Sequence, residues 1–285
     1  MIEMMEAGIQ KEQPNIAVLL TCFNRKEKTK ICITSLAEQG EDYRLEFIVT
    51  DDQSTDGTAK MLQTLPFAVR VLEGTGGLFW TGGMNRSIDE ALVHADRYQY
   101  IMFVNDDVQF YPDAVSRLLK RLEQTGADIV VGSTMDSHGK MSYGGVRMTS
   151  KHFARYQMIE PSEQPQYCDT FNCNCILMKT DIFQRLGRLD PAYIHSMGDY
   201  DYGMTASGMG FAIVNCDAHI GTCDDNGTEG TWKDISLSRK ERLRLKESPK
   251  GLPRHDWFHF VRKNYGFLPA CYHSITPYLR ILLKK

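Results

Sequence analysis

Acidic residues gather in three short groups along the chain, and these groups are the first candidates for chemistry. The groups are Asp51-Asp52, Asn105-Asp106-Asp107 and Asp199-Tyr200-Asp201. Carboxylates that converge on one place repel one another unless a cation or a hydrogen-bonding ligand compensates their charge. A convergent set therefore suits a divalent metal ion that also binds phosphate oxygens. Each group taken alone is equally consistent with the acidic first turn of a helix.

A glycine-rich stretch over residues 74–85 is the next candidate. It reads Gly-Thr-Gly-Gly-Leu-Phe-Trp-Thr-Gly-Gly-Met-Asn. Glycines let the backbone approach a ligand closely, and the N-terminus of a helix attracts phosphate groups. We expect a loop over residues 74–83 and a helix over residues 85–96. Trp80 and Met84 are expected to shape a substrate pocket, although an aromatic residue in a loop is as often plain packing.

Short apolar runs rich in β-branched residues predict the strands that position these groups. Segments of helical length separate the runs, and this alternation predicts a parallel sheet with helices on both faces. Ligands bind beyond the carboxyl ends of the strands in such a sheet, so acids that directly follow two strands project toward one edge. The predicted strands cover residues 16–21, 45–50, 69–72, 100–104 and 129–132.

The pattern is looser after residue 132. We expect strands over residues 173–178 and 210–215 and short helices over residues 181–186 and 199–208. Closing helices are predicted for residues 257–265 and 276–285. Residues 239–246 form a basic run that we interpret as a solvated face, with contact to a diphosphate, an anionic glycan or an acidic bilayer surface as the alternative.

Composition excludes several classes of protein. The 285 residues are 42% hydrophobic and 24% charged, which is ordinary for a globular chain. The 33 Lys and Arg residues against 36 Asp and Glu residues give a formal charge of -3, which argues against nucleic-acid binding. Residues 1–13 form a polar leader without a signal-peptide pattern, and no apolar run is long enough to span a membrane. We therefore expect a cytoplasmic protein.

Several motifs, in order along the chain, resemble those of family-2 glycosyltransferases. Residues 51–58, Asp-Asp-Gln-Ser-Thr-Asp-Gly-Thr, resemble the family element Asp-Asp-Gly-Ser-Thr-Asp-Gly-Thr. Residues 18–25, Val-Leu-Leu-Thr-Cys-Phe-Asn-Arg, resemble the first strand, and residues 76–85 resemble the loop and helix start that follow. Residues 105–107 resemble the metal motif, and residues 199–201 resemble the motif that carries the catalytic base. The matches extend over roughly residues 14–220.

The resemblance implies a GT-A fold, which is a Rossmann-like α/β architecture with a mostly parallel central sheet and helices on both faces. We expect a catalytic domain over residues 14–235 and a small helical C-terminal extension over residues 236–285. The catalytic domain would divide into a nucleotide-sugar half, about residues 14–132, and an acceptor half, about residues 133–235.

The resemblance also implies roles in binding a nucleotide-diphosphate sugar. Thr21, Asn24 and Arg25 would lie along the nucleoside and the phosphates. Asp52, with Asp51, would accept a hydrogen bond from an N–H group of the base.

The remaining implied roles concern the sugar, the metal and the acceptor. Gly76 and Asn85 belong to the donor-binding loop and helix start, and Asp106 would contact the donor sugar or the ribose. Asp107 would coordinate Mg²⁺ or Mn²⁺, which neutralises charge on the departing diphosphate. Asp199 would take the proton from the acceptor hydroxyl.

Two positions depart from the family pattern. The metal motif begins with Asn105 where the family has an acid, so we expect a second ligand from elsewhere and name His219, which is otherwise an ordinary loop histidine. The base motif has Gly198 where the family often has Glu. Asp199 then remains the expected base, and Asp201 is expected to be structural.

We therefore predict an inverting glycosyltransferase, rhamnosyltransferase-like or a similar hexosyltransferase, that extends a surface polysaccharide, O-antigen or lipid-linked glycan. Peripheral contact with a membrane surface is a further expectation, because the C-terminal residues 278–285 are apolar with a basic end.

The alternatives are an inactive glycan-binding or scaffold protein on the same fold and, with less support, a sugar-phosphate nucleotidyltransferase. The nucleotidyltransferase would need a glycine-rich phosphate loop after the first strand, where residues 21–25 read Thr-Cys-Phe-Asn-Arg. The oligomeric state stays open.

Overall fold

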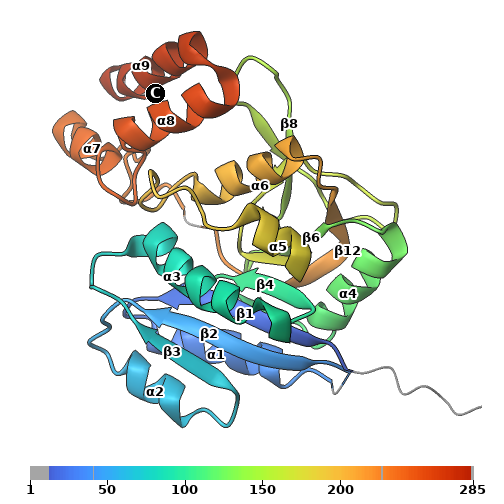
Figure 1. The fold of residues 1–285 in the computed structure, drawn as a ribbon. Helices are drawn as coiled ribbons and strands as arrows, with labels where there is room; N and C mark the ends of the chain where they lie inside the picture. Colours follow the sequence, from blue (N-terminus) through green and yellow to red (C-terminus); the bar gives the residue numbers. More distant parts are fainter. Residues whose placement is uncertain (1–12, 41, 226, 284–285) are drawn as a thin grey trace, which may run out of the picture.

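A mixed central sheet organises the protein (Figure 1). The computed structural model describes residues 13–40, 42–225 and 227–283. In these residues the sheet has nine strands in the order β3-β2-β1-β4-β11-β6-β12-β5, with β7 paired to β6. The strands are β1 (Asn15–Cys22), β2 (Arg44–Asp51), β3 (Val69–Glu73), β4 (Tyr100–Val104), β5 (Gln109–Phe110), β6 (Ile129–Met135), β7 (Met141–Tyr143), β11 (Cys175–Lys179) and β12 (Ile213–Thr222).

The strand directions divide the sheet in two. Strands β3, β2, β1 and β4 are parallel, so their carboxyl ends meet at one edge as the sequence predicts. Strand β11 runs antiparallel between β4 and β6, while β12 is parallel to β6. A separate small sheet contains β8 (Gly145–Met148), β9 (Tyr156–Met158) and β10 (Thr170–Phe171).

Buried side chains on both faces of the sheet hold the helices in place. In β1, Ile16, Val18 and Leu20 join one core cluster, and Ala17 and Leu19 join another, because side chains of a strand alternate between faces. The first cluster includes residues of α1 (Lys26–Ala37), α2 (Thr58–Thr64) and α4 (Ala114–Thr125). The second includes residues of α3 (Phe79–Val93), α5 (Thr180–Leu186) and α6 (Gly198–Gly208).

Helix α3 corrects the expected loop over residues 74–83, because the helix already begins at Phe79. The carboxylate of Asp52, after β2, accepts hydrogen bonds from the N–H groups of Leu78 and Phe79. An acidic group at a helix N-terminus satisfies donors that have no partner within the helix. Helix α3 also packs closely on β1, since a side chain at Gly83 would overlap Thr21.

Three helices close the chain: α7 (Arg239–Lys246), α8 (Arg254–Tyr265) and α9 (Phe267–Leu282). They gather on one side of the molecule, at the end of α6 (Figure 1). Buried side chains of α8 and α9 form a third core cluster, with Phe260 of α8 and Ala270 of α9 in one cluster with Tyr193. Helix α9 begins well before the expected 276.

The basic run over residues 239–246 is only partly a solvated face, which corrects that expectation. Arg242 is buried, and its Nε donates a hydrogen bond to the carbonyl of Trp232. Lys246 is also buried, with its Nζ 2.6 Å from a carboxylate oxygen of Glu247 and 4.1 Å from the ring centre of Tyr278. These contacts fix α7 to α9 and to the segment that precedes the extension.

The structure bears in part on two expectations, the polar leader and the absence of a membrane-spanning segment. The predicted leader over residues 1–13 lies outside the described residues except for Gln13. Among the helices of the described residues, none combines the length and the apolar character needed to cross a bilayer.

Candidate active site

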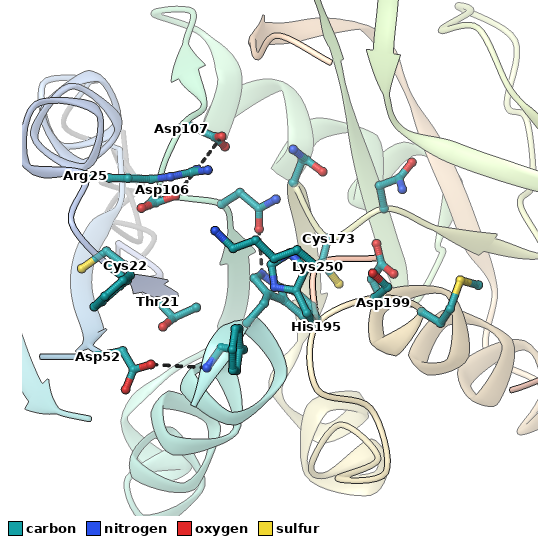
Figure 2. Close-up of a pocket in the computed structure, with 18 of the residues that line it drawn as sticks. Thr21, Cys22, Arg25, Asp52, Asp106, Asp107, Cys173, His195, Asp199 and Lys250 are labelled. Atoms are coloured by element: carbon teal, nitrogen blue, oxygen red, sulfur yellow. Dashed lines mark hydrogen bonds and ion pairs between the residues drawn. The ribbon is translucent and has the colours of Figure 1, made fainter. Parts of the chain in front are cut away.

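A cleft of about 470 Å³ opens at the carboxyl ends of β1, β2 and β4 (Figure 2). Thr21 and Cys22 end β1, Asp52 follows β2, and residues 105–107 follow β4, so the parallel strands deliver all of them to one place. The start of α3, residues 172–174 and residues 195–200 form other walls. The sheet edge predicted from the strand pattern is therefore the site of the cleft.

Arg25 joins the two acids that follow β4. Its Nη1 lies 3.1 Å from Oδ1 of Asp106 and 2.8 Å from Oδ2 of Asp107. Asp106 is buried, and this burial raises the pKa of its carboxyl to about 6, against the lowering effect of Arg25. The guanidinium thus supplies the positive charge that two adjacent carboxylates require.

Asn105, the position where the resemblance leads one to expect an acid, has a specific partner. Its side-chain oxygen accepts a hydrogen bond of 2.9 Å from the indole N–H of Trp80. A neutral amide makes this contact without adding a third negative charge beside Asp106 and Asp107. Trp80 lies in the first turn of α3, so the bond links this helix to the end of β4.

Asp52 holds the glycine-rich segment in its folded form. One carboxylate oxygen accepts from the N–H groups of Thr75 and Gly76, at 3.0 and 2.7 Å, and the other accepts from Leu78 and Phe79, at 2.8 and 3.3 Å. A carboxylate has about four lone-pair sites, so backbone donors occupy all of them in this conformation. Its position in the cleft fits the predicted donor site, but its lone pairs already have partners.

Asp199, in the first turn of α6, faces the cleft from the side opposite Arg25 and Asp107 (Figure 2). Burial raises the pKa of its carboxyl to about 6, and hydrogen bonds from the Tyr200 N–H and the Asn172 side chain lower it in part. The Tyr200 bond is 2.8 Å long. A carboxylate with this pKa is ionised at neutral pH and still a useful proton acceptor.

Two cleft residues, His195 and Lys250, were not predicted from the sequence. Lys250 follows α7 and forms no ion pair within the described ranges, while its side chain lines the cleft (Figure 2). His195 has a pKa lowered to about 4, first by burial and then by the charges of Lys250 and Arg25. Both lie in loops without a distinctive motif, so tertiary packing alone brings them here.

Most of the predicted site residues come together in this cleft. Each of them touches the same cavity although they come from segments far apart in the chain. They are Thr21, Arg25, Asp52, Gly76, Asp106, Asp107 and Asp199.

Two residues expected to contact the donor lie next to the cleft without lining it. The side-chain oxygen of Asn24 accepts a 2.7 Å hydrogen bond from the N–H of Thr55. Asp51 is buried, and its Oδ1 accepts a 3.2 Å bond from the N–H of Ser54. Both side chains thus stabilise the turn after β2, against which the loop after β1 rests.

Two further predicted residues are not brought into the cleft. The buried Asn85 side chain exchanges two hydrogen bonds with the backbone of Leu189, at 3.0 and 2.8 Å. His219 lies within β12, and its Nε2 is 3.9 Å from a carboxylate oxygen of Glu160. His219 is not among the residues that line the cleft with Asp107.

The acids after β4 suit a metal that is shared with a ligand. Across the described ranges, no three His, Cys, Asp or Glu side chains cluster as a metal site of the protein alone. Mg²⁺ and similar ions are commonly held by one or two carboxylates together with substrate phosphates. Asp106 and Asp107 fit that arrangement because they are adjacent carboxylates in a cleft large enough for a nucleotide.

Comparison with solved structures shows the fold. The chain is similar to the mannosyltransferase PcManGT of Pyrobaculum calidifontis in complex with GDP-Man and Mn²⁺, with 15% identity, a TM-score of 0.57 and coverage of 96% of this chain and 74% of that one. It is also similar to S. aureus TarS residues 1–349 in complex with UDP-GlcNAc, with 13% identity, a TM-score of 0.57 and coverage of 94% and 81%. The architecture is the GT-A fold.

Sequence comparison adds two curated relatives. A glycosyltransferase of Campylobacter jejuni, the GalNAc(5)-diNAcBac-PP-undecaprenol beta-1,3-glucosyltransferase, is 25% identical over 130 residues, or 45% of this chain and 41% of that protein. An uncharacterized protein of Methanocaldococcus jannaschii is 26% identical over 123 residues, or 42% and 52% of the two chains. The chain thus spans about half the length of these relatives.

Residues 17–187, more than half of the chain, match the family described as Glycosyl transferase family 2. The geometry of the cleft and this match lead to one conclusion: the chain belongs to glycosyltransferase family 2.

Proposed function

We propose that the chain transfers a sugar, with inversion, from a nucleotide-diphosphate sugar to a hydroxyl group of an acceptor glycan, with the help of Mg²⁺ or Mn²⁺. One observation supports this most strongly. Asp199 lines the same cleft as Asp106 and Asp107 and lies on the side opposite to them (Figure 2). A proton acceptor and a site for a phosphate-bound cation are the two elements that this transfer requires.

The diphosphate of the donor would lie on the side of Arg25. Asp107, with Asp106, would hold the metal ion, which when bound supplies positive charge for the departing diphosphate. Arg25 and Lys250 would contact phosphate oxygens, since both cations line the cleft. Phosphate contacts by such cations strengthen as charge accumulates on the leaving group.

The acceptor would approach from the side of Asp199. Its hydroxyl oxygen forms a bond to the anomeric carbon while Asp199 takes the hydroxyl proton. The bond from that carbon to the donor phosphate oxygen breaks on the opposite face, and its electron pair leaves with the nucleoside diphosphate. Attack and departure on opposite faces invert the configuration, and a base with a pKa of about 6 is ionised for this step at neutral pH.

The similar proteins suggest which donor and acceptor classes to propose. Their names and complexes include GDP-Man, UDP-GlcNAc and a glycan on diphosphate-undecaprenol. We take nucleotide sugars of these two kinds as first donors, and a surface polysaccharide or lipid-linked glycan as the acceptor. The reaction would take place in the cytoplasm, with peripheral contact to the inner face of the membrane where the acceptor is lipid-linked.

Turnover of the donor by matched variants tests the proposal. We expect release of UDP or GDP from UDP-GlcNAc or GDP-mannose in the presence of Mn²⁺. Asp199→Asn should lower this rate by about 10²–10⁴-fold, as loss of a general base does. Asp181→Asn, which changes an exposed acid of α5, should leave the rate unchanged. Bound donor without turnover in the unaltered chain would instead support the inactive scaffold.

A further inference from the structure

A second pocket of about 480 Å³ adjoins the active-site cleft and lies outside the proposed donor site. The two cavities share Met197 and Tyr200 as lining residues. These residues flank Asp199 in the sequence, and Asp199 itself lines the active-site cleft, so the wall shared by the two cavities lies beside the predicted base. Helices α8 and α9 supply the far walls, with Trp257 on α8 and His273 on α9.

The second pocket is cationic. Three basic side chains, Arg155, Lys233 and Arg280, line it, and no Asp or Glu is among its lining residues. None of the three forms an ion pair with another residue in the part of the chain that the structure describes. Burial, and then the nearby charges of Arg155 and Arg280, lower the pKa of His273. The two arginines therefore act on the same region of the pocket.

Aromatic side chains line the same pocket as these cations. The Trp257 indole N–H donates a 3.0 Å hydrogen bond to the carbonyl of His273, which fixes the indole ring. The ring of Phe153 lies 5.9 Å from that of Tyr272, edge to face. Tyr156 meets Tyr200 in the same manner at 5.0 Å. Rigid aromatic faces bind the apolar faces of sugars and lipids at low entropic cost.

We propose that this second pocket binds the phosphate or diphosphate group that links an acceptor sugar to its carrier. The inference rests on the proposed transferase function and specifies its acceptor. Arg155 and Arg280 would pair with phosphate oxygens, as guanidinium groups do with planar fork geometry. The sugar next to the phosphate would lie along Tyr200 and reach Asp199 through the shared wall.

Tryptophan positions give a direct readout of this pocket. The chain has three Trp residues: Trp80 lines the active-site cleft, and Trp232 and Trp257 line the second pocket. In a Trp80→Phe background, tryptophan fluorescence therefore reports on the second pocket. We would titrate this protein with N-acetylglucosamine 1-phosphate in EDTA, so that no divalent ion recruits the phosphate to Asp107.

We expect a saturable fluorescence change that N-acetylglucosamine without phosphate produces at least tenfold more weakly. Arg155→Gln/Arg280→Gln should weaken sugar-phosphate binding by about tenfold or more. Arg239→Gln/Lys240→Gln, which removes the same charge from exposed positions of α7, should leave it unchanged. Equal affinity of both double variants, or of the two sugars, would overturn the proposal.

Two further measurements are needed. The first distinguishes a lipid-linked phosphate from a phosphate within the glycan, and the second distinguishes failure of the second-pocket proposal from failure of the proposed transferase function. Tighter binding of farnesyl diphosphate than of inorganic pyrophosphate would indicate a lipid carrier, and equal binding would indicate a phosphate within the glycan. Calorimetry of UDP with Mn²⁺ on the Arg155→Gln/Arg280→Gln variant should match the unaltered chain. UDP binding without any sugar-phosphate binding would overturn the second-pocket proposal alone. Sugar-phosphate binding without nucleotide binding would instead overturn the proposed function.

Discussion

The Nη1 atom of Arg25 lies 2.8 Å from Oδ2 of Asp107, in the position of a counter-charge for the expected metal ligand. The same guanidinium contacts Asp106. Arg25 follows β1 and the acids follow β4, so the two neighbouring parallel strands create this contact. A protein cation thus balances the carboxylates, and we expect a metal ion to share this task when the donor binds.

Arg25→Gln tests whether Arg25 and a metal ion both compensate the charge of Asp106 and Asp107, through its effect on the free energy of unfolding. Without divalent ions the variant leaves two adjacent acids uncompensated, and we expect the free energy of unfolding to fall by about 1 kcal/mol, since Arg25 is partly exposed. Mn²⁺ together with UDP should recover part of the loss because the bound ion supplies the missing charge. Urea unfolding in EDTA and in Mn²⁺ with UDP measures both values, with Arg239→Gln as the control. Equal losses in the two buffers would contradict a metal at Asp107.

The pH dependence of transfer should follow Asp199. Its carboxyl has a pKa of about 6 and must be ionised to accept a proton. The rate should therefore rise about tenfold per pH unit below this pKa and level off above it. Asp199→Asn should give a low rate without this inflection. An unchanged inflection in the variant would assign it to another group, such as Asp106, whose carboxyl also has a pKa of about 6.

Asp199 also predicts a pH-dependent change in stability. Its pKa is raised in the folded state, so the folded protein binds more protons than the unfolded chain between the ordinary value of 3.8 and about 6. Stability from this group therefore falls as pH rises through that window, and the cost is complete above it. Asp199→Asn should raise the free energy of unfolding by about 1–3 kcal/mol near neutral pH and by nearly nothing at about pH 4. Urea unfolding at both pH values checks the sign, and a gain of equal size at low pH would contradict it.

The four hydrogen bonds to Asp52 predict a local effect on α3. Asp52→Asn retains one acceptor oxygen, so two of the four backbone donors lose their partner, and we expect a destabilisation of about 2 kcal/mol. Hydrogen exchange should accelerate first at the amides of residues 75–79. Asp56→Asn, in the following turn, is the control and should not change exchange there. Uniform acceleration across the sheet would show that Asp52 acts globally.

The sequence predicts the parallel strands β1 to β4 and their ends well, because buried parallel strands have a local signature. Asp52, Asp107 and Asp199 reach one cleft since each directly follows or begins an element that short-range patterns reveal. The start of α3 could not be predicted in this way, because the acceptor at its N-terminus is Asp52, far back in the chain. Lys250 enters the cleft only through packing of the C-terminal extension.

Polar residues whose partners lie far away in the chain could not be predicted from the sequence either. Asn85 stands in a motif-like position, yet its amide pairs with Leu189, which lies 104 residues away. His219 follows the expected end of the strand over residues 210–215, but β12 continues to Thr222 and includes it, with His219 paired to Ser133 of β6. Long-range pairing decided both positions, and local spacing does not show it.

The buried Asp201 couples the C-terminal extension to the helix that carries Asp199. Its Oδ2 lies 2.6 Å from Nζ of Lys263, and its Oδ1 accepts a hydrogen bond from Asn264. Lys263→Met should destabilise the fold by about 2–3 kcal/mol because it leaves a buried charge with only a neutral donor. Addition of Asp201→Asn should restore part of this loss. Urea unfolding of both singles and the double variant gives the coupling energy, and purely additive losses would contradict the pairing.

Nucleotide binding is the most direct test of whether this cleft contains a metal-dependent donor site. Calorimetry with UDP and GDP, in Mn²⁺ and in EDTA, would be performed on the unaltered chain, on Asp107→Ala and on the control Asp181→Ala. We expect one nucleotide to bind the unaltered chain and the control only with Mn²⁺, and Asp107→Ala to lose this binding. Failure of both nucleotides to bind in Mn²⁺, or equal binding by Asp107→Ala, would contradict a metal-dependent donor site in this cleft.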